Sequence, residues 1–580
     1  MGDFTLYHKD RLSTQDVART VSCLARQGST NPVSLEHDRY VISFFPKHFL
    51  PEKPEKNIIL RNNGQNNGDF CGSSGCFIYK GLMGEKALSA LLRDFTIKDY
   101  QPTHYSGIFT VILRKNNRLY LLTDPMGGNR VYQNDRQSFW SSSFLAAATA
   151  VRKLSINEQA LYEYAFQETT YGNETIFKEV TCLNSLKIFE ITPDGLIAHD
   201  KKLTFDFQPS AAPLHDLVAQ TIGMLRDTVR PVSEIFGDRI STALSGGYDS
   251  RLMLALLKDA GSTPGVYVYG PDDSPDVTVA RTIANSEGFP LEHINKGNYP
   301  LPAAQEYARI IQDNFYALDG LPGEGIFDFG ANMATRRKRS GQGHMIFNGG
   351  GGEIFRNFFY LPDGKFAVND LINSFYSRYT TAFCQDGFNE NHYRAALHDK
   401  IKTAVGTETE KLNRQQVEYV YPAFRLRYWT SRDNNNNTRL GPYLTPFVSY
   451  NMIKQALTIP ISLKNHGIFQ AELIRAISPK LAAYDSDYGY PFDRAIPLKA
   501  KIKNMLTYYR PTSLRRYSYS IQHKLGQLTL PKTLSPEYLE PISMTELPLI
   551  AQYFKIDKIK DAALLGRLHT LEYLFRHFAL

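Results

Sequence analysis

The sequence predicts a mixed α/β protein in which a strand-dominated α+β sandwich precedes a parallel-sheet domain with a helical C-terminal part. Three patterns lead to this fold class. Short β-branched and aromatic runs, separated by Asn, Gly and Pro, dominate from Tyr40 to about residue 205. Strand and helix patterns then alternate from residue 239, as they do in parallel sheets covered by helices. Helical patterns rich in Lys and Arg follow Pro497.

The length of 580 residues exceeds what one hydrophobic core usually serves, so two or more domains are expected. We place a first domain at 1–206, a second at 207–498 and a basic helical extension at 499–580. The hydrophobic content of 42% and the charged content of 21% are those of an ordinary globular protein.

Net charge and segment composition limit the classes of partner that the sequence predicts. The net charge of +8 is a mild excess over this length, and no basic domain with interleaved aromatics indicates nucleic-acid binding. The N-terminus has no basic segment followed by an apolar stretch, and no run of about 18 apolar residues occurs. Five cysteines are few and odd in number, which suits a reducing compartment. We therefore expect a cytoplasmic protein without membrane or nucleic-acid partners.

The elements of both domains follow from periodicity. In the first domain, strands are predicted at 40–45, 77–79, 108–113 and 118–123, and helices at 84–92 and 156–166. In the second, a helix at 214–229 precedes strands at 239–244, 265–269 and 291–294, which alternate with helices at 251–260 and 276–287. Parallel strands end at one edge of their sheet, and ligands bind there.

The segment 244–250 joins the first of these strands to its helix. Gly246 and Gly247 let the backbone approach a ligand closely, and Ser245 and Ser250 add hydroxyl donors. The helix N-terminus adds partial positive charge, so the segment predicts a phosphate-binding turn. The Lys of the longer nucleotide-binding glycine loop is missing.

A second glycine-rich turn follows an apolar strand pattern at 345–347. Four consecutive glycines at 349–352 precede Glu353. Because each glycine costs backbone entropy, close approach of the backbone to a ligand explains the run better than stability does.

These motifs carry a family resemblance. The segment 245–250, Ser-Gly-Gly-Tyr-Asp-Ser, resembles the Ser-Gly-Gly-x-Asp-Ser loop of ATP pyrophosphatases. The segments 124–132 and 141–146 resemble the Asp-Pro-x-Gly-x-x-Pro-Leu-Tyr and Ser-Ser-x-x-x-Ala segments of the asparagine synthetase family. The segments 274–276 and 348–355 resemble its Ser-Pro-Asp and its second phosphate loop, Gly-x-Gly-x-Asp-Glu-x-Phe. The resemblance covers about residues 40 to 492.

The resemblance implies an N-terminal sandwich of the Ntn-hydrolase, glutamine-amidotransferase type and an ATP-pyrophosphatase domain with an adenine nucleotide α-hydrolase-like fold. It implies ATP and Mg²⁺ as ligands, with Asp249 and Glu353 holding the metal and Asp249, Glu353 and Asp487 at the reacting groups. The residues implied in nucleotide binding lie at the ends of three strands: Leu244, Ser245, Gly246, Gly247, Asp249, Ser250, Val268, Tyr269, Gly270, Gly349 and Gly350.

Three positions depart from the family pattern. Gly2 stands where glutamine-hydrolysing members have a nucleophilic Cys, so the first domain is expected to be a scaffold without glutaminase activity. Gly352 replaces an Asp that would help hold magnesium, and Asp487 falls where the family has a Lys. The candidates to replace that carboxylate are Glu353 and Asp319, and the candidates to replace that cation are Arg356, Lys499, Lys501 and Lys503.

Two polar segments are interpreted without a ligand. The four basic residues at 336–339 point around a helix, so a solvated face is expected. The four asparagines at 434–437 are interpreted as a polar loop that carries helix caps or is exposed.

The predicted function is an AMP- and pyrophosphate-forming amide ligase that adenylates a small-molecule or peptide carboxylate and joins it to ammonia or an amine. A homodimer is one assembly to test. Ammonia-dependent asparagine synthesis and a nucleotide-binding pseudoenzyme that acts as a scaffold stay open as alternatives. The β-lactam-forming and lasso-peptide-cyclising branches of the family fit the missing glutaminase, because their nucleophile is an amine on the substrate.

Overall fold

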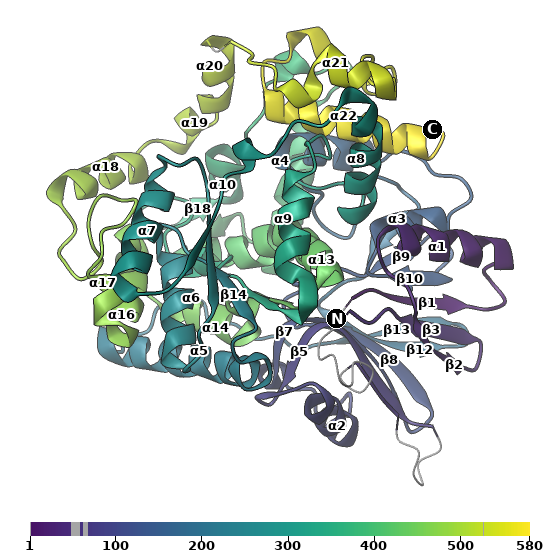
Figure 1. The fold of residues 1–580 in the computed structure, drawn as a ribbon, viewed down its shortest axis with the longest axis horizontal. Helices are drawn as coiled ribbons and strands as arrows, with labels where there is room; N and C mark the ends of the chain where they lie inside the picture. The colour runs from purple at the N-terminus through teal and green to yellow at the C-terminus, as the bar shows by residue number, and fades with distance from the viewer. Residues whose placement is uncertain (1, 48–57, 62–67, 526) are drawn as a thin grey trace.

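The computed structural model describes residues 2–47, 58–61, 68–525 and 527–580 (Figure 1). Over these ranges the protein is a mixed α/β fold with two antiparallel sheets followed by a parallel one, as the sequence predicts. In Figure 1 the antiparallel sheets occupy the lower right and the parallel sheet the centre left. No helix in these ranges is long and apolar enough to span a bilayer.

The antiparallel sheets form a sandwich. One sheet has the order β11, β9, β10, β1, β3, β2, and the other β13, β12, β8, β7, β5, β4, with β6 beside β5. The first contains β1 (Phe4–His8), β2 (Val33–His37), β3 (Tyr40–Phe44), β9 (Tyr132–Asn134), β10 (Phe139–Ser141) and β11 (Val180–Cys182). The second contains β4 (Ile59–Arg61), β5 (Phe70–Tyr79), β6 (Leu82–Met83), β7 (Tyr105–Lys115), β8 (Arg118–Thr123), β12 (Lys187–Thr192) and β13 (Gly195–Asp200). Every strand predicted for the first domain falls on an observed one.

Alternation of apolar residues along these strands builds the sandwich core. Phe44 and Trp140 from one sheet meet Ile112 and Leu121 from the other, and all four are buried. Four helices cover the outer faces and edges of the sandwich: α1 (Thr14–Arg26), α2 (Glu85–Asp94), α3 (Phe144–Thr149) and α4 (Glu158–Gln167).

The parallel sheet has the order β16, β15, β14, β17, β20. Its strands are β14 (Ile240–Ala243), β15 (Gly265–Tyr269), β16 (Leu291–Ile294), β17 (Met345–Phe347) and β20 (Tyr443–Leu444). The chain fills one side of β14 first and then the other, so the strand order reverses at β14. This reversal opens a crevice at the carboxyl ends of β14 and β17, where open α/β sheets bind ligands.

The helices beside the parallel sheet are α5 (Leu214–Phe236), α6 (Tyr248–Asp259), α7 (Pro275–Glu287), α8 (Ala304–Ala317) and α9 (Ala331–Ser340). The first three overlap the helices predicted at 214–229, 251–260 and 276–287, although α5 continues to Phe236, and α8 was not predicted. Helix α6 begins three residues before the predicted start at residue 251. Asp249 and Ser250 therefore belong to the first helical turn, where backbone N–H groups have no intrahelical partner.

A long helix joins the two halves of the chain. It consists of α12 (Arg414–Val420), a π-helical segment η6 (Tyr421–Thr430) and α13 (Ser431–Leu440). The interpretation of residues 434–437 as a polar loop was wrong: they lie in α13, and Asn434, Asn435 and Asn436 are buried. Asn435 accepts a hydrogen bond from the Arg130 backbone N–H and donates to the carbonyls of Arg130 and Ser142 at 2.8–2.9 Å. The amides are buried because they saturate the backbone groups of the sandwich.

A buried ion pair fixes the same interface. The guanidinium of Arg439, at the end of α13, is fully buried and lies 2.8 Å from Oδ2 of Asp3 and 3.5 Å from Oδ2 of Asp319. Burial opposes ionisation of Asp3, but the charge and hydrogen bonds of Arg439 outweigh it and hold the pKa of Asp3 below its usual value. Asp319 also accepts hydrogen bonds from the backbone N–H groups of Phe144 and Leu145 at the start of α3.

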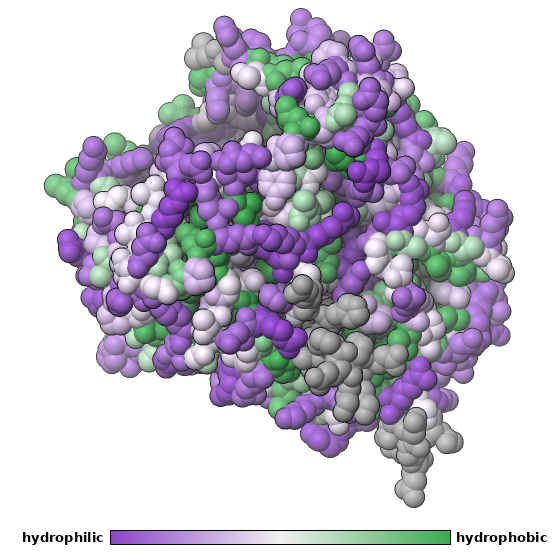
Figure 2. Space-filling view, viewed as in Figure 1, coloured by the Kyte–Doolittle hydropathy of each residue, from purple (hydrophilic) through white to green (hydrophobic). Residues whose placement is uncertain are grey.

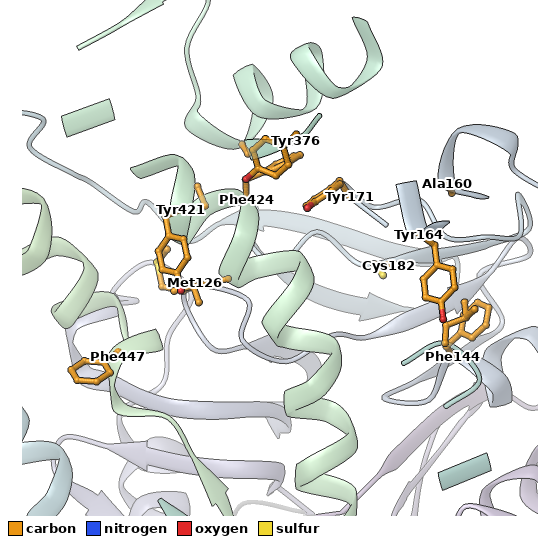
Figure 3. Close-up of a cluster of buried hydrophobic side chains, with 14 of the residues drawn as sticks. Met126, Phe144, Ala160, Tyr164, Tyr171, Cys182, Tyr376, Tyr421, Phe424 and Phe447 are labelled. Atoms are coloured by element: carbon orange, nitrogen blue, oxygen red, sulfur yellow. The ribbon is translucent and has the colours of Figure 1, made fainter. Parts of the chain in front are cut away.

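An aromatic cluster extends this contact (Figure 3). Tyr171 of the first domain stacks on Phe424 of η6 with ring centroids 4.0 Å apart, and Tyr376 meets both rings edge-on. These rings belong to one core that continues into Phe144 and Tyr164. The two halves of the protein therefore share a core.

The C-terminal helices divide into two groups. Helices α18 (Leu498–Tyr508), α19 (Thr512–Arg515) and α20 (Ser518–Leu525) form an arm at the upper left of Figure 1. Large apolar side chains of α18 are exposed, with Leu498 at 73% and Leu506 at 72%, and this part of the surface is green at the left edge of Figure 2. Helices α21 (Pro536–Leu539) and α22 (Ala562–His577) instead pack into the shared core, where Arg567 Nε donates to the carbonyl of Ala165 at 2.8 Å.

The remaining helices of the second half lie around the parallel sheet and beneath the arm. They are α10 (Val368–Phe375), α11 (Glu390–Val405), α14 (Tyr450–Thr458), α15 (Ile461–Lys464), α16 (Ile468–Ile477) and α17 (Pro479–Ala482), and a two-stranded ribbon of β18 (Phe366–Ala367) and β19 (Lys411–Leu412) joins them.

We predict that Asn435→Ala lowers the thermal unfolding midpoint and costs about 3 kcal/mol, because it leaves buried carbonyl and N–H groups of the sandwich without partners. Differential scanning calorimetry measures the effect. The matched control is Asn437→Ala in the same helix, where the lost hydrogen bond is a single one to partly exposed Arg336 and the expected cost is below about 1 kcal/mol. Equal effects of the two substitutions would contradict this account of α13.

Candidate functional site

The two glycine-rich turns meet at the crevice beside β14. A Cβ built on Gly349 would lie 2.9 Å from the backbone of Asp249, so only glycine allows this approach. The turns after β14 and β17 are thus in direct contact, although about a hundred residues separate them in the chain.

The first turn is held by its own hydroxyls and by one carboxylate. The backbone N–H of Ser245 donates to Oγ of Ser250 at 2.9 Å, and the two hydroxyls are 2.9 Å apart. The backbone N–H of Gly246 donates to Oδ1 of Asp276 at 2.8 Å. Gly247 is the N-cap of α6 and offers no side-chain oxygen to the first turn of the helix. The N-terminus of α6 therefore carries partial positive charge without a capping group.

Asp249 lies at the centre of the site. Its Oδ2 is 2.7 Å from Nη2 of Arg356, and its Oδ1 accepts a hydrogen bond from Nε2 of Gln470 at 2.6 Å. Burial raises the pKa of Asp249 to about 6, with a smaller rise from Glu353 and opposing effects of Arg356 and Gln470. The carboxyl is therefore protonated at a higher pH than an ordinary aspartate is.

Glu353 completes a pair of carboxylates around one cation. Its Oε1 lies 3.4 Å from the same Nη2 of Arg356, and Tyr421 of η6 donates to its Oε2 at 2.8 Å. Mg²⁺ is commonly held by one or two carboxylates together with phosphate oxygens. Two acidic side chains that already converge on one positive group fit a magnesium ion shared with a nucleotide. Across the ranges the structure describes, no group of three or more His, Cys, Asp or Glu could hold a metal alone.

The glycine at 352 is required by Asp249. A Cβ at this position would lie 2.0 Å from Oδ1 of Asp249 and 2.9 Å from Nε2 of Gln470. The family Asp therefore has no room here while Asp249 keeps its present contacts. The departure from the family pattern reflects how the space is shared between two side chains.

Asp487 lies against the first glycine turn, at 245–250. Its backbone N–H donates to the carbonyl of Gly246 at 3.3 Å, and a Cβ on Gly246 would be 2.6 Å from its own Cβ. Burial and, next, the charge of Asp276 raise the pKa of Asp487. The turn is thus flanked by two carboxylates where the family has a lysine.

The residues predicted at the end of β15 lie next to this turn. The side chains of Leu244 and Val268 belong to the hydrophobic core, so only their backbones are available to a ligand. Two cations flank the ring of Tyr269, Nζ of Lys296 at 4.9 Å and the guanidinium of Arg339 at 4.9 Å. Gly270 adopts φ +144, which a side chain rarely permits.

The prediction of a solvated basic face at 336–339 holds only in part. Arg337 and Lys338 are exposed. Arg339 instead turns inward to the rings of Tyr267 and Tyr269, and its Nε and Nη1 atoms are buried without a hydrogen-bond partner in the described part of the chain. The expectation that Arg339 belongs to a solvated face was therefore wrong.

Four of the residues considered as substitutes for the carboxylate and the lysine of the asparagine synthetase pattern do not reach the site. Asp319 was a candidate magnesium ligand, but it caps α3 and pairs with Arg439 at the domain interface. The lysines at 499, 501 and 503 are exposed on α18, whereas Arg356 contacts Asp249 directly. Sequence reasoning missed Gln470 and Tyr421, because no local motif marks a single Gln or Tyr brought in from a distant helix.

The first domain shows no nucleophile of the glutaminase type in its described residues. Gly2 is buried with φ +97, and a Cβ there would lie 1.9 Å from the carbonyl oxygen of Phe45. The described cysteines are all buried, and burial raises the pKa of Cys23, Cys76 and Cys384 to about 12. Thiols of this kind are inert.

Comparisons with known proteins identify no family. No family model matches the chain, and no curated protein matches it. Among solved structures the chain is similar to an allosteric regulatory enzyme of purine biosynthesis, with 12% identity and a TM-score of 0.26, over 50% of this chain and 65% of that one. It is also similar to glutamine phosphoribosylpyrophosphate amidotransferase from B. subtilis, with 13% identity and a TM-score of 0.25, over the same shares of the two chains. Likenesses of this size assign neither a fold nor an activity to this chain.

We predict that Gly352→Ala weakens binding of Mg²⁺-ATP at least about tenfold, because the new Cβ displaces the Asp249 carboxylate from its position. Isothermal titration calorimetry measures the affinity. Gly223→Ala, at a helical position with no atom within 4 Å of the new Cβ, serves as the control and is expected to bind as the wild type does. Unchanged affinity of Gly352→Ala would show that the position of Asp249 is not needed.

We predict that binding of Mg²⁺-ATP releases protons in acid. The pKa of Asp249 in the free protein is about 6, and a bound cation would lower it. Below that pKa the carboxyl must lose its proton to bind, so about one proton should be released per complex near pH 5 and none near pH 8. Calorimetry in two buffers of different ionisation enthalpy counts these protons. Equal proton release at both pH values contradicts the assignment.

Proposed function

We propose that this protein is an ATP-dependent amide ligase, related to asparagine synthetases, that releases AMP and pyrophosphate. One observation carries the proposal. At the point where the strand order reverses, the uncapped N-terminus of α6 carries Asp249 beside the hydroxyls of Ser245 and Ser250, and Glu353 and Arg356 meet Asp249 from the contacting glycine turn. This combination suits a polyphosphate with a divalent cation better than it suits a neutral ligand.

In the proposed reaction, an oxygen of the substrate carboxylate attacks the α-phosphorus of ATP. The bond from that phosphorus to the bridging oxygen breaks, and pyrophosphate leaves. The nitrogen of ammonia or an amine then attacks the acyl carbon and loses a proton, and AMP leaves with the acyl oxygen. Such chemistry requires positioning and charge stabilisation more than covalent catalysis.

The residues of the first turn would bind the pyrophosphate portion. The hydroxyls of Ser245 and Ser250 hydrogen-bond to each other at 2.9 Å. On binding, each hydroxyl would exchange this partner for a phosphate oxygen. Asp249 and Glu353 would hold Mg²⁺, which would neutralise the phosphate charge. Arg356 is already between these carboxylates and would supply the positive charge that the family draws from its lysine.

Asp487 has a different proposed role. A carboxylate beside a polyphosphate is repulsive unless it meets a cation or an amine. Its position against Gly246 and its raised pKa suit a group that binds the ammonium form of the nucleophile and takes its proton, which frees the nitrogen lone pair for attack.

The first domain is proposed to act as a scaffold. With a glycine at position 2 and inert thiols, it would supply no ammonia from glutamine. The nucleophile is therefore proposed to be free ammonia or an amine of a second substrate.

We predict that pyrophosphate is released from Mg²⁺-ATP only with a suitable acid and amine, and that Asp249→Ala lowers this rate at least about a hundredfold, since it removes the ligand at the centre of the site. A coupled pyrophosphate assay with aspartate plus ammonia, and then with panels of acids and amines, measures it. Asp259→Ala, at the other end of α6 in an exposed ion pair with Arg226, is the control and should keep full activity.

The outcome of this assay separates the alternatives. Release with aspartate and ammonia alone identifies asparagine synthesis. ATP binding without pyrophosphate release with any acid favours the scaffold and rejects the ligase.

A further inference from the structure

A large cavity opens beside the proposed reaction centre. Its volume is about 770 Å³, within the range of pockets that hold whole drug-sized ligands. Glu353 and Arg356 line one end, and Tyr519, Asp561 and Arg567 line the other. A ligand in the cavity can therefore reach Glu353 and Arg356 while most of its length lies elsewhere.

The walls of the cavity come from distant parts of the chain. One wall is the segment after the second glycine turn together with α10, and the other is the arm of α18 to α20, with α22 at the far end. Arg515 of α19 joins the walls, because its Nη1 donates to the carbonyl of Phe359 at 3.0 Å and its Nη2 to that of Tyr360 at 2.8 Å. The arm is thus part of a binding site as well as a surface.

An apolar strip runs along the first wall. Phe358 and Phe375 are partly exposed to the cavity, and their ring centroids are 4.7 Å apart. Tyr360 extends the strip toward the arm, where its ring meets Tyr508 at 6.0 Å. Rings arranged in this way suit an apolar or aromatic group of a ligand.

Positive charge on the cavity surface is incompletely neutralised. Five arginines line it against three carboxylates, those of Glu168, Glu353 and Asp561. Within the described chain, Arg378 contacts the ring of Phe375, Arg510 donates to the Ser518 hydroxyl, and neither forms an ion pair with a carboxylate. Arg515 has only backbone carbonyls as partners among the described residues.

We propose that this cavity binds the acyl substrate, and that the substrate is an acidic peptide. Its reacting carboxylate lies at the Arg356 end, an apolar or aromatic residue lies on the Phe358–Phe375 strip, and a second acidic side chain pairs with Arg378 and Arg510. A single amino acid such as aspartate would fill only a small part of the volume and would leave these arginines without anions. The inference rests on the proposed ligase for the reacting end, and the remainder rests on the cavity itself.

A randomised peptide pool tests the proposal, because the sequence of the bound peptide need not be specified. The probe is a mixture of N-acetylated tetrapeptides randomised at every position, which is passed over immobilised full-length protein with and without Mg²⁺-ATP. We expect the retained fraction to be enriched in Asp or Glu together with an aromatic residue. In the double variant Arg378→Gln/Arg510→Gln, we expect this enrichment to fall at least about fivefold while the affinity for Mg²⁺-ATP is unchanged.

The controls distinguish failure of the acidic-peptide site from failure of the proposed ligase. Arg309→Gln, on the exposed face of α8, removes one positive charge far from the cavity lining and should retain peptides as the wild type does. Equal retention by the wild type and the double variant, or a retained fraction without acidic enrichment, overturns the acidic-peptide site. Arginine-dependent retention by a protein that binds no ATP supports the site and removes the ligase instead.

Discussion

The buried guanidinium of Arg439 is the contact on which the arrangement of this protein depends. It is surrounded by Asp3, the residue before β1, and Asp319 from the second half, with no exposure to solvent. Removing one partner of a buried ion pair typically costs about 3–5 kcal/mol, because the other charge stays buried without compensation. Here two carboxylates would lose their counter-charge at once, and Asp319 also caps α3. The docking of α13 on the sandwich, and with it the placement of the long helix, follows from this contact.

The long helix transmits that placement to the candidate site. Its C-terminal part carries the buried asparagines and Arg439, and its π-helical segment begins at Tyr421, which donates to Glu353. Extra residues in a π-helical turn shift side chains around the axis, and such segments are frequent at functional sites. One element therefore sets both the contact with the sandwich and the position of one of the two carboxylates at the candidate site. The scaffold role proposed for the first domain has its physical basis in this shared helix.

Periodicity alone located most of the parallel sheet. The strands at 265–269, 291–294 and 345–347 have the predicted bounds, because short segments that alternate with helical patterns and lie between glycine and polar turns leave few other choices. The asparagines at 434–437 were misjudged because a buried amide needs carbonyls that accept its hydrogen bonds, and here these carbonyls lie far away in the chain. The sequence around the asparagines does not show these acceptors. For the same reason Gln470 and Tyr421 were missed, and Gly352 was interpreted as a lost ligand although Asp249 fills its space. Arg356 was among the candidate cations, but only its contact with Asp249 distinguishes it from the lysines of α18.

The Asp3–Arg439 pair also has a consequence for biosynthesis. The two residues are 436 positions apart in the chain. At translation rates of about 5–20 residues per second, the first strand would wait roughly 20–90 s for its counter-charge to leave the ribosome. During that interval the carboxylate of Asp3 and the backbone groups of 130 and 142 are without their final partners. The nascent first half is therefore an incomplete fold that is finished only when α13 arrives.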